Sequence, residues 1–317
     1  MNIPKSQRKN NPLSMERYAK FLRKKLLFKK FHQEALVKSQ SAMEYLMTYG
    51  WSILIIAVVL GALSFLGIFN PLTFAPKASP GNCQVVKNTQ LGVSNLVGSC
   101  NNQVPQYVAQ FNGASYITAN IPSIPVGAAQ RTITMWLKSN KTDVNTMAMS
   151  YGSTGGCGTY NFYGLRAQST GSYWFDQWCT GGTINSVNIN GAWNFVALEY
   201  NGTYFIMYVL NNSGTSMVVN KGTAATNFSE FTISPNTDGN RWHGYISNVQ
   251  IYNTSMANTS IQTMYKNGIG ASPIDLQNLV AWYPLNGNTK DYSGNNNQGL
   301  PYGVKFANNW YGGYTLS

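Results

Sequence analysis

Histidine and acidic residues are scarce in this sequence, which limits the chemistry it can perform. Two histidines and ten Asp and Glu residues are present among 317 residues, against 22 Lys and Arg. Sugar-cleaving enzymes need two carboxylates held close together, and no pair of acids alternates along one strand-like segment. No Gly-x-Ser-x-Gly motif occurs, and His243 is the only histidine beyond the N-terminal region, so a hydrolytic triad is not expected. The sequence predicts a protein that is not an enzyme.

Charged residues are also absent between Tyr45 and Pro76, and Tyr49–Phe69 within this stretch is almost wholly apolar. About 20 apolar residues span a bilayer as a helix, so we predict a membrane-spanning helix at residues 40–69. Ala57 and Gly61 form a small-xxx-small pair, which lets another helix approach closely. The membrane and like subunits are therefore the partners expected for this helix.

Basic residues are concentrated before the apolar stretch. Residues 1–39 hold 11 Lys and Arg against two Glu, so nine of the twelve net positive charges lie there. Positive residues on one side of a first helix stay in the cytoplasm, and lysines interleaved with Phe and Leu are typical of a helix on an anionic membrane face. We predict a cytoplasmic leader at 1–39, an extracellular remainder, a single-pass location in the cell membrane and no nucleic-acid partner.

Four residues mark the start of the apolar stretch: Lys38 and Ser39 precede Gln40, and Glu44 is the single acid at its mouth. This arrangement resembles an archaeal class III signal peptide, as carried by type IV pilin-like proteins. The resemblance implies that a prepilin-type peptidase cuts between Ser39 and Gln40 and leaves the helix on the mature protein. Glu44 would then be the fifth mature residue and would meet the N-terminal amine of Gln40 in a neighbouring subunit. A plain signal anchor, with Glu44 among lipid headgroups, is the alternative.

Prolines and cysteines define the next segment, residues 70–106. Three prolines between Asn70 and Gly81 end the helix and are typical of a short stalk. The exported part then holds four cysteines, which favours two disulfides in an oxidising exterior. Three pairings are open, and sequence order favours Cys83 with Cys100 and Cys157 with Cys179. A zinc site is the alternative, although no Cys-x-x-Cys pair is present.

From Tyr107 onward, short aromatic and β-branched runs alternate with Gly, Asn and Ser turns, which predicts an antiparallel β-sandwich. Segments such as NGAWNFVALEY and GYISNVQIYN resemble, in order, the laminin-G-like, concanavalin A-like jelly roll. The resemblance covers residues 107–270. Ser247 and Asn248 stand where that family often has an acidic residue, which weakens any calcium site at this position. Family strand positions place four tryptophans in the core, Trp136, Trp193, Trp242 and Trp282.

The last segment, residues 271–317, contains LVAWYPLNGNTKDYSGNNNQG from Leu279. This stretch resembles the opening strand and loop of the same family, which normally precede the first matching segment. A truncated second domain or a circular permutation would explain the order, and too few residues remain for a second sandwich. We therefore predict that Leu279–Leu285 pairs beside the strand Tyr245–Tyr252 and closes an otherwise open edge.

The run SYWFDQWC supplies the candidate ligand-binding residues Trp174, Asp176 and Trp178. Strand alternation places them on the face opposite to Tyr173 and Phe175. If that second face is buried, the two tryptophans face outward around one acid, and flat aromatic surface beside a polar group grips sugars. The alternative is that both tryptophans fill the core or pack beneath a loop.

Asp291, Asn295 and Asn297 place oxygen ligands in one tight loop, which makes them candidate ligands of Ca²⁺, the one cofactor indicated. An ordinary Gly-Asn turn is the alternative. Six Asn-x-Ser/Thr motifs offer glycosylation sites in an exported domain, at Asn140, Asn201, Asn211, Asn227, Asn253 and Asn258.

Together these features predict a mainly β protein, with an N-terminal transmembrane α-helix followed by an antiparallel sandwich. We interpret it as a pilin-like or membrane-anchored protein of the cell surface that adheres to glycans or surface partners and assembles into filaments. A membrane-tethered carbohydrate-active enzyme and a purely structural envelope protein are the alternatives. The ligand is not specified, because loop shape and not fold decides it.

The processing hypothesis predicts the N-terminal residue of the mature protein. Mass spectrometry of the terminal peptide of the membrane-extracted protein should identify Gln40, because the cleavage leaves the helix in place. A terminal peptide that starts at Met1 or Met15 would contradict cleavage and leave a plain membrane anchor.

Overall fold

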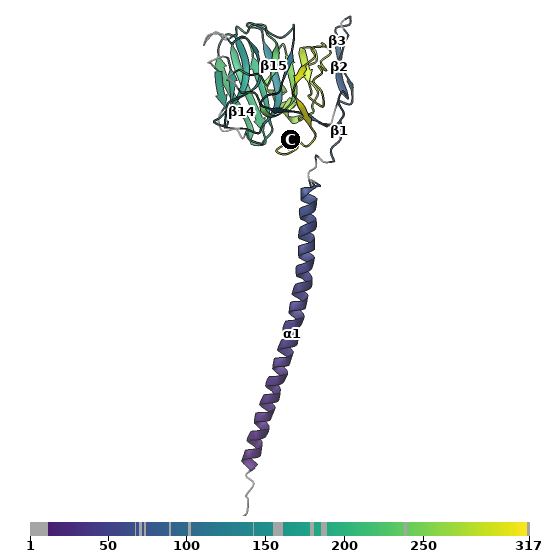
Figure 1. Ribbon diagram of the computed structural model, residues 1–317, viewed down its shortest axis with the longest axis vertical. Helices are drawn as coiled ribbons and strands as arrows, with labels where there is room; N and C mark the ends of the chain where they lie inside the picture. The colour runs from purple at the N-terminus through teal and green to yellow at the C-terminus, as the bar shows by residue number, and fades with distance from the viewer. Residues whose placement is uncertain are drawn as a thin grey trace, which may run out of the picture. The chain divides into compact units, whose positions relative to one another are not determined.

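The computed structural model of the protein describes residues 12–66, 68–69, 72, 74–88, 90–100, 103–141, 143–154, 161–177, 181–184, 189–237 and 240–315. The chain divides into two compact units, Met1–Thr73 and Phe74–Ser317. The first unit consists mainly of one long helix, and the second contains the strands (Figure 1).

The helix α1 (Pro12–Phe65) has 54 residues and runs without interruption through the predicted leader, the predicted cleavage point and the apolar stretch. Sequence analysis separated leader and spanning helix at residue 39. They form one helix because no Pro or Gly occurs from residue 13 to residue 49. Met43–Phe65 is long and apolar enough to cross a membrane, and its side chains, such as Trp51 and Ile55, are exposed.

Two antiparallel sheets form the second unit. The eight-stranded sheet contains β5 (Val108–Asn112), β7 (Arg131–Ser139), β12 (Asn194–Tyr200), β13 (Tyr204–Asn211), β14 (Gly214–Lys221), β16 (His243–Tyr252), β17 (Leu279–Tyr283) and β19 (Lys305–Ala307). Its order is β14-β13-β12-β7-β16-β5-β19, with β17 also paired to β16.

The seven-stranded sheet contains β6 (Tyr116–Ala119), β8 (Thr146–Gly152), β9 (Phe162–Gln168), β10 (Ser172–Asp176), β11 (Gly181–Ile184), β15 (Phe231–Ile233) and β18 (Leu300–Tyr302). Its order is β11-β10-β9-β8-β15-β6-β18. The fold is therefore mainly β, as the sequence predicted.

The core lies between the two sheets and follows the alternation of each strand. Leu165 of β9 and Phe175 of β10 face Val196 and Leu198 of β12 in one cluster of buried side chains. All four tryptophans assigned to the core are buried, at 0 to 3% exposure, but only Trp242 belongs to the cluster between the sheets, and Trp136, Trp193 and Trp282 are buried outside it.

The two sheets differ in what covers their outer faces. On the eight-stranded sheet, Trp136 of β7 packs against Tyr265 of the helix α2 (Asn258–Lys266) and against Tyr314 near the C-terminus, with ring centroids 5.5 Å apart in both pairs. Trp193 likewise packs edge-on against Trp310 at 5.9 Å. The helix α2 and the tail therefore bury the outer face of this sheet. On the outer face of the seven-stranded sheet, Met147, Phe162 and Arg166 are buried as well, and the accessible part lies around β6, β15 and β18.

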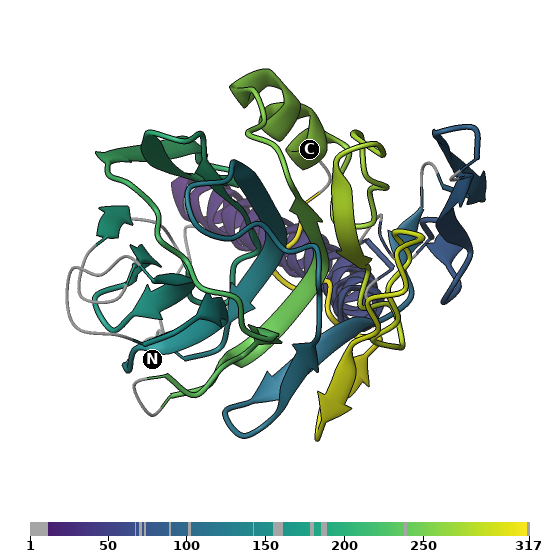
Figure 2. The ribbon, with the colours of Figure 1, turned by 90° about the horizontal axis from the view of Figure 1, so that it is seen from above.

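The tail pairs back into the sandwich, which confirms the prediction for Leu279–Leu285. Residues 249–252 of β16 pair with β17, and residues 243–246 pair with β5 along the same edge. The tail adds two further strands that were not predicted: β18 pairs with β6 and β19 pairs with β5. In Figure 2 the yellow tail strands lie beside the blue β5–β6 hairpin.

A buried polar network holds β17 against β16. Asn248 Oδ1 accepts hydrogen bonds from Trp282 Nε1 at 2.8 Å and from Gln250 Nε2 at 2.9 Å, and Asn248 Nδ2 donates to Ala271 O at 2.8 Å. Asn248 has a left-handed backbone, with φ of 51°, where the pairing of β16 with β7 shifts register between Ser247 and Gln250. Asn248, which stands where the family often has an acid, thus has a structural role: its side chain holds β17 against β16.

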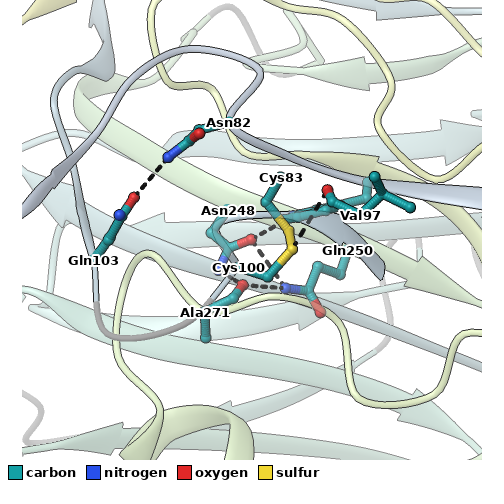
Figure 3. Close-up of a disulfide and its surroundings, with 9 residues drawn as sticks. Asn82, Cys83, Val97, Cys100, Gln103, Asn248, Gln250 and Ala271 are labelled. Atoms are coloured by element: carbon teal, nitrogen blue, oxygen red, sulfur yellow. Dashed lines mark hydrogen bonds between the residues drawn. A yellow bond between two sulfur atoms is a disulfide. The ribbon is translucent and has the colours of Figure 1, made fainter. Parts of the chain in front are cut away.

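A disulfide-closed hairpin contacts the same region. The strands β2 (Cys83–Asn88) and β3 (Val93–Gly98) are closed by the Cys83–Cys100 disulfide, the pairing that sequence order favoured. Val85 N donates to Tyr292 O at 2.8 Å, and Lys87 Nζ donates to Leu279 O at 2.9 Å, so the hairpin packs on the tail. The disulfide and Asn248 line one small cavity of about 40 Å³ (Figure 3). Preceding the hairpin, β1 (Lys77–Ala78) pairs with β4 (Val104–Pro105).

The hydrogen bonds and the left-handed backbone of Asn248 predict that two substitutions at this position lower the free energy of unfolding by different amounts. Asn248→Ala should destabilise residues 74–317 by about 3–5 kcal/mol, because two buried N–H donors lose their acceptor and a side chain remains in the left-handed region. Asn248→Gly should cost about 1–2 kcal/mol less, since glycine adopts that backbone freely. Urea unfolding of the three proteins measures both differences, and equal midpoints would contradict the assignment.

Candidate functional site

An open cleft lies on the outer face of the seven-stranded sheet. It has a volume of about 480 Å³ and is lined by residues of β6, β8 and β15, of the start of β9 and of the segment 235–241. Alternation along β6 sends Ile117 and Ala119 into the core and Tyr116 and Thr118 to this face. Thr232 of β15 reaches the same face and pairs with Thr118 across the sheet. Hydroxyl groups therefore line the floor of the cleft.

Three side chains stack beside the cleft, and two of them, Tyr116 and Arg241, line it. The ring of Tyr302, from β18, lies 4.4 Å from the ring of Tyr116 with an interplanar angle of 10°. Arg241 places its guanidinium carbon 3.9 Å from the centroid of Tyr116. Tyr116 thus lies between a tyrosine, which is 45% exposed, and a cation. Tyr302 thus offers a flat aromatic surface, and Arg241, beyond Tyr116, offers hydrogen-bond donors to the cleft; both kinds of group suit a sugar with polar substituents.

Arg241 is held by its own segment as well as by Tyr116. Its Nη1 donates to Ser234 O at 2.7 Å, and Met147 N donates to Asn240 O at 3.2 Å, which ties the segment to β8. Burial lowers the pKa of the Arg241 guanidinium. Among the described residues no carboxylate forms an ion pair with Arg241. Glu230 also lines the cleft, at an exposed position.

Asp176 is placed differently from the prediction. Tyr173 and Phe175 face the core and Trp174 lies half-buried on the outer face, so the predicted alternation is correct. Asp176, however, is 0% exposed and forms an ion pair with Arg166, whose guanidinium carbon lies 4.8 Å from the Trp174 ring centroid. The prediction of an outward acid was wrong, because the neighbouring strand β9 supplies a cation that neutralises it. Trp178 lies outside the described residues.

The stack and the Trp174 region lie along one row of the seven-stranded sheet. Trp174 of β10 pairs with Arg166 of β9, and Arg166 pairs with Met147 of β8. Met147 in turn forms a bridge with Arg241. Met147 and Arg166 are buried, at 2 and 7% exposure, so the row does not form a continuous open surface between the two.

The predicted calcium ligands do come together, but their polar groups are engaged with the protein. The Asp291 carboxylate accepts four hydrogen bonds, from the N–H groups of Trp282, Ser293 and Asn297 and from the Ser293 hydroxyl, at 2.8–3.0 Å. The side-chain nitrogens of Asn295 and Asn297 donate to Val280 O. Donors that surround a carboxylate exclude a cation from it, so the geometry favours the turn alternative over a calcium site. Instead, the hydrogen bonds of the loop to Trp282 N and Val280 O hold it against β17.

The predicted modification sites divide by exposure. Asn140, Asn227, Asn253 and Asn258 have exposed side chains. Asn201 and Asn211 are half-buried and use their side-chain oxygens to hold the turns on either side of β13. Glycosylation at all six sites remains a prediction. The second predicted disulfide, Cys157 with Cys179, lies outside the described residues, and the side chains of Ser39 and Gln40 are likewise not described; Glu44 is exposed on α1.

Two carboxylates considered for an enzymatic alternative lie on different sheets. Asp176 is on the outer face of the seven-stranded sheet, whereas Glu199 is on the covered face of the eight-stranded sheet, where it accepts a hydrogen bond from Ser255. Burial raises the pKa of Glu199, and the hydrogen bonds from Ser255 and Tyr208 oppose this rise. Sheets in a sandwich lie about 10 Å apart, so these two acids, on opposite outer faces, cannot act on one bond.

Sequence reasoning missed Tyr116, Thr118, Thr232 and Arg241, which line the cleft, and Tyr302, which stacks on Tyr116. The alternation in ASYITAN was a sufficient signal for Tyr116 and Thr118. Arg241 and Tyr302 reach the cleft only through the pairing of the tail and of the segment before β16, which no local pattern indicates.

Residues 111–262 match the family model described as the Concanavalin A-like lectin/glucanases superfamily, slightly less than half of the chain. The sandwich is a laminin-G-like, concanavalin A-like domain, as its two sheets and this match both indicate. The match stops before the tail, so β17, β18 and β19 lie outside it. Comparison with curated proteins gives no match.

Solved structures with related folds are distant. A putative carbohydrate binding protein from Bacteroides ovatus shares 15% identity, with a TM-score of 0.46, over 68% of this chain and 66% of its own. The SAP-like pentraxin of Limulus polyphemus shares 16%, with a TM-score of 0.44, over 63% of this chain and 94% of its own. The enzymatically active domain of a tailspike from bacteriophage CBA120 shares 16%, with a TM-score of 0.43, over 67% of this chain and 34% of its own. Likenesses at this level identify neither a ligand nor an activity for this chain.

The hydrogen bonds of the Asp291 loop predict that removal of this one carboxylate lowers the free energy of unfolding strongly. Asp291→Ala should destabilise residues 74–317 by about 2–4 kcal/mol, because four donors lose a charged acceptor. Asp143→Ala is the matched control: Asp143 is 72% exposed and 3.9 Å from Lys141, and such pairs contribute less than about 1 kcal/mol. Urea unfolding measures both. A calcium-dependent rise in the unfolding midpoint that disappears in Asp291→Ala would contradict a metal-free loop.

Proposed function

We propose that this protein is a membrane-anchored protein of the cell surface whose sandwich binds glycans in the cleft of the seven-stranded sheet. The observation that carries the proposal is the stack of Tyr302, Tyr116 and Arg241 beside the cleft, at the accessible part of the seven-stranded sheet, while α2 and the tail cover the other sheet. Sugars offer flat C–H faces to aromatic rings and hydroxyls to polar groups. Thr118, Thr232 and Arg241 supply such polar groups around the rings.

Anchoring by α1 forms the second part of the proposal. Its apolar stretch, with exposed side chains and a basic segment before it, suits a helix that crosses the membrane once with its N-terminus in the cytoplasm. Cleavage by a prepilin-type peptidase before Gln40 and assembly of the helix with like subunits would turn the anchor into the core of a filament. The terminal-residue measurement described above tests cleavage, and a helix that stays monomeric after cleavage would exclude filaments.

An enzymatic role is the second candidate, and one observation favours it: Glu230 is an exposed carboxylate at the cleft. A glycosidase of the common type needs a second carboxylate within about 5–10 Å. Turnover of a polysaccharide by the protein, abolished in Glu230→Gln, would establish this role over simple binding. A structural envelope protein without a ligand would give no signal on a glycan array.

The stacking surface predicts a loss of binding. Tyr302→Ala should weaken binding of the best glycan found on an array about tenfold, or about 1.4 kcal/mol, because one aromatic face is removed. Tyr204→Ala is the matched control, since Tyr204 is 40% exposed on β13 of the other sheet. Isothermal titration of the three proteins measures the effect. Equal affinity of the Tyr302 variant and the native protein would place the ligand elsewhere.

A further inference from the structure

We infer that the cleft selects glycans that carry an anionic group, and that the Arg241 guanidinium binds this group. The inference rests on the proposed function and adds the chemical class of the ligand. It follows from three properties of Arg241 among the described residues: a fixed position, a charge that no carboxylate there pairs with, and N–H donors that no acceptor there uses.

The position of Arg241 is fixed by a rigid anchor. Ser234, whose carbonyl accepts the hydrogen bond from Arg241, is 0% exposed and has a left-handed backbone with φ of 61°. Its N–H donates to Ala148 O, its hydroxyl donates to Ser115 O, and the same hydroxyl oxygen accepts from Trp242 N. The Tyr116 ring supports the guanidinium from one side. A side chain held in this way loses little conformational entropy when a ligand binds.

The charge of Arg241 is not balanced by the described residues. The two ion pairs among them join Lys141 to Asp143 and Arg166 to Asp176. Asp176, the buried acid on this sheet face, therefore already pairs with Arg166 and does not balance the charge of Arg241. Glu230 is exposed, so water stabilises its charge without a partner. A partly desolvated cation without a partner is costly, and an anionic ligand removes that cost.

The free donors of Arg241 suit a planar anion. A guanidinium has five N–H donors in a fixed fork, and the protein uses one of them, towards Ser234 O. Arg241 lines the cleft itself, so the carboxylate of a sugar bound in the cleft would meet the fork directly. Uronic acids and other carboxylated sugars are therefore the expected ligand class.

The test compares the same sugar chain with and without its charge. The full chain in detergent micelles is titrated with oligogalacturonate and with its methyl ester, and then with a panel of acidic oligosaccharides and their neutral counterparts. At least a tenfold preference for the acid form is expected, and it should decrease as salt is raised. Sulfated oligosaccharides in the panel distinguish a carboxylate site from a general anion site.

Variants assign the preference to one residue. Arg241→Gln should reduce the ratio of acid-form to neutral-form affinity to near unity, and Arg241→Lys should leave an intermediate ratio because the charge remains without the planar fork. Lys221→Gln is the control, since Lys221 is exposed on β14 of the other sheet. Circular dichroism confirms that each variant is folded.

The outcomes separate this inference from the proposed function. Equal binding of acid and neutral forms, or a preference that persists in Arg241→Gln, would overturn the inference and leave glycan binding in place. Absence of binding to every member of the panel would overturn both.

Discussion

The structure depends on the way β16 divides its edge between two partners. Its first half pairs with β5 and its second half with β17, and the register shift at Asn248 separates the two. A β-bulge bends a strand and ends regular pairing locally, and here the polar network of Asn248, Gln250 and Trp282 fixes the bend. The tail can join the sheet only because this half of β16 is left free. The positions of β18 and β19, and hence of Tyr302, follow from that junction.

The two sheets differ in how far their outer faces are covered. Aromatic residues on the outer face of the eight-stranded sheet are sealed by Tyr265 and Tyr314. On the other sheet Met147 and Arg166 are buried, whereas β6 and β15 carry outward hydroxyls and Tyr302 is 45% exposed. The accessible part of this face is therefore limited to the region of β6, β15 and β18.

Sequence alone predicted those features that depend on local pattern. Alternation in SYWFDQWC assigned Tyr173 and Phe175 to the core correctly, and the resemblance of the tail to an opening strand predicted the pairing of β17. The sequence did not reveal that Asp176 is buried, because its partner Arg166 becomes adjacent only when β9 and β10 pair. Nor did it bring Tyr116 and Arg241 together, since 125 residues separate them and the pairing of whole strands decides their distance. The Asp291 loop shows a related limit: composition indicated oxygen ligands, whereas the direction of the surrounding N–H groups decides what they bind.

The order in which the strands are made gives the tail a further consequence. Ribosomes synthesise β5, β6 and β16 before β17, β18 and β19, so the sandwich has unpaired edges until the last strands emerge. Contacts between segments this far apart close late in folding, because the intervening loop must first be ordered. Tyr302 arrives with these late strands. A chain stopped before β18 therefore lacks both its final edge strands and the exposed ring of Tyr302, so the stack on Tyr116 forms only when synthesis has passed β18.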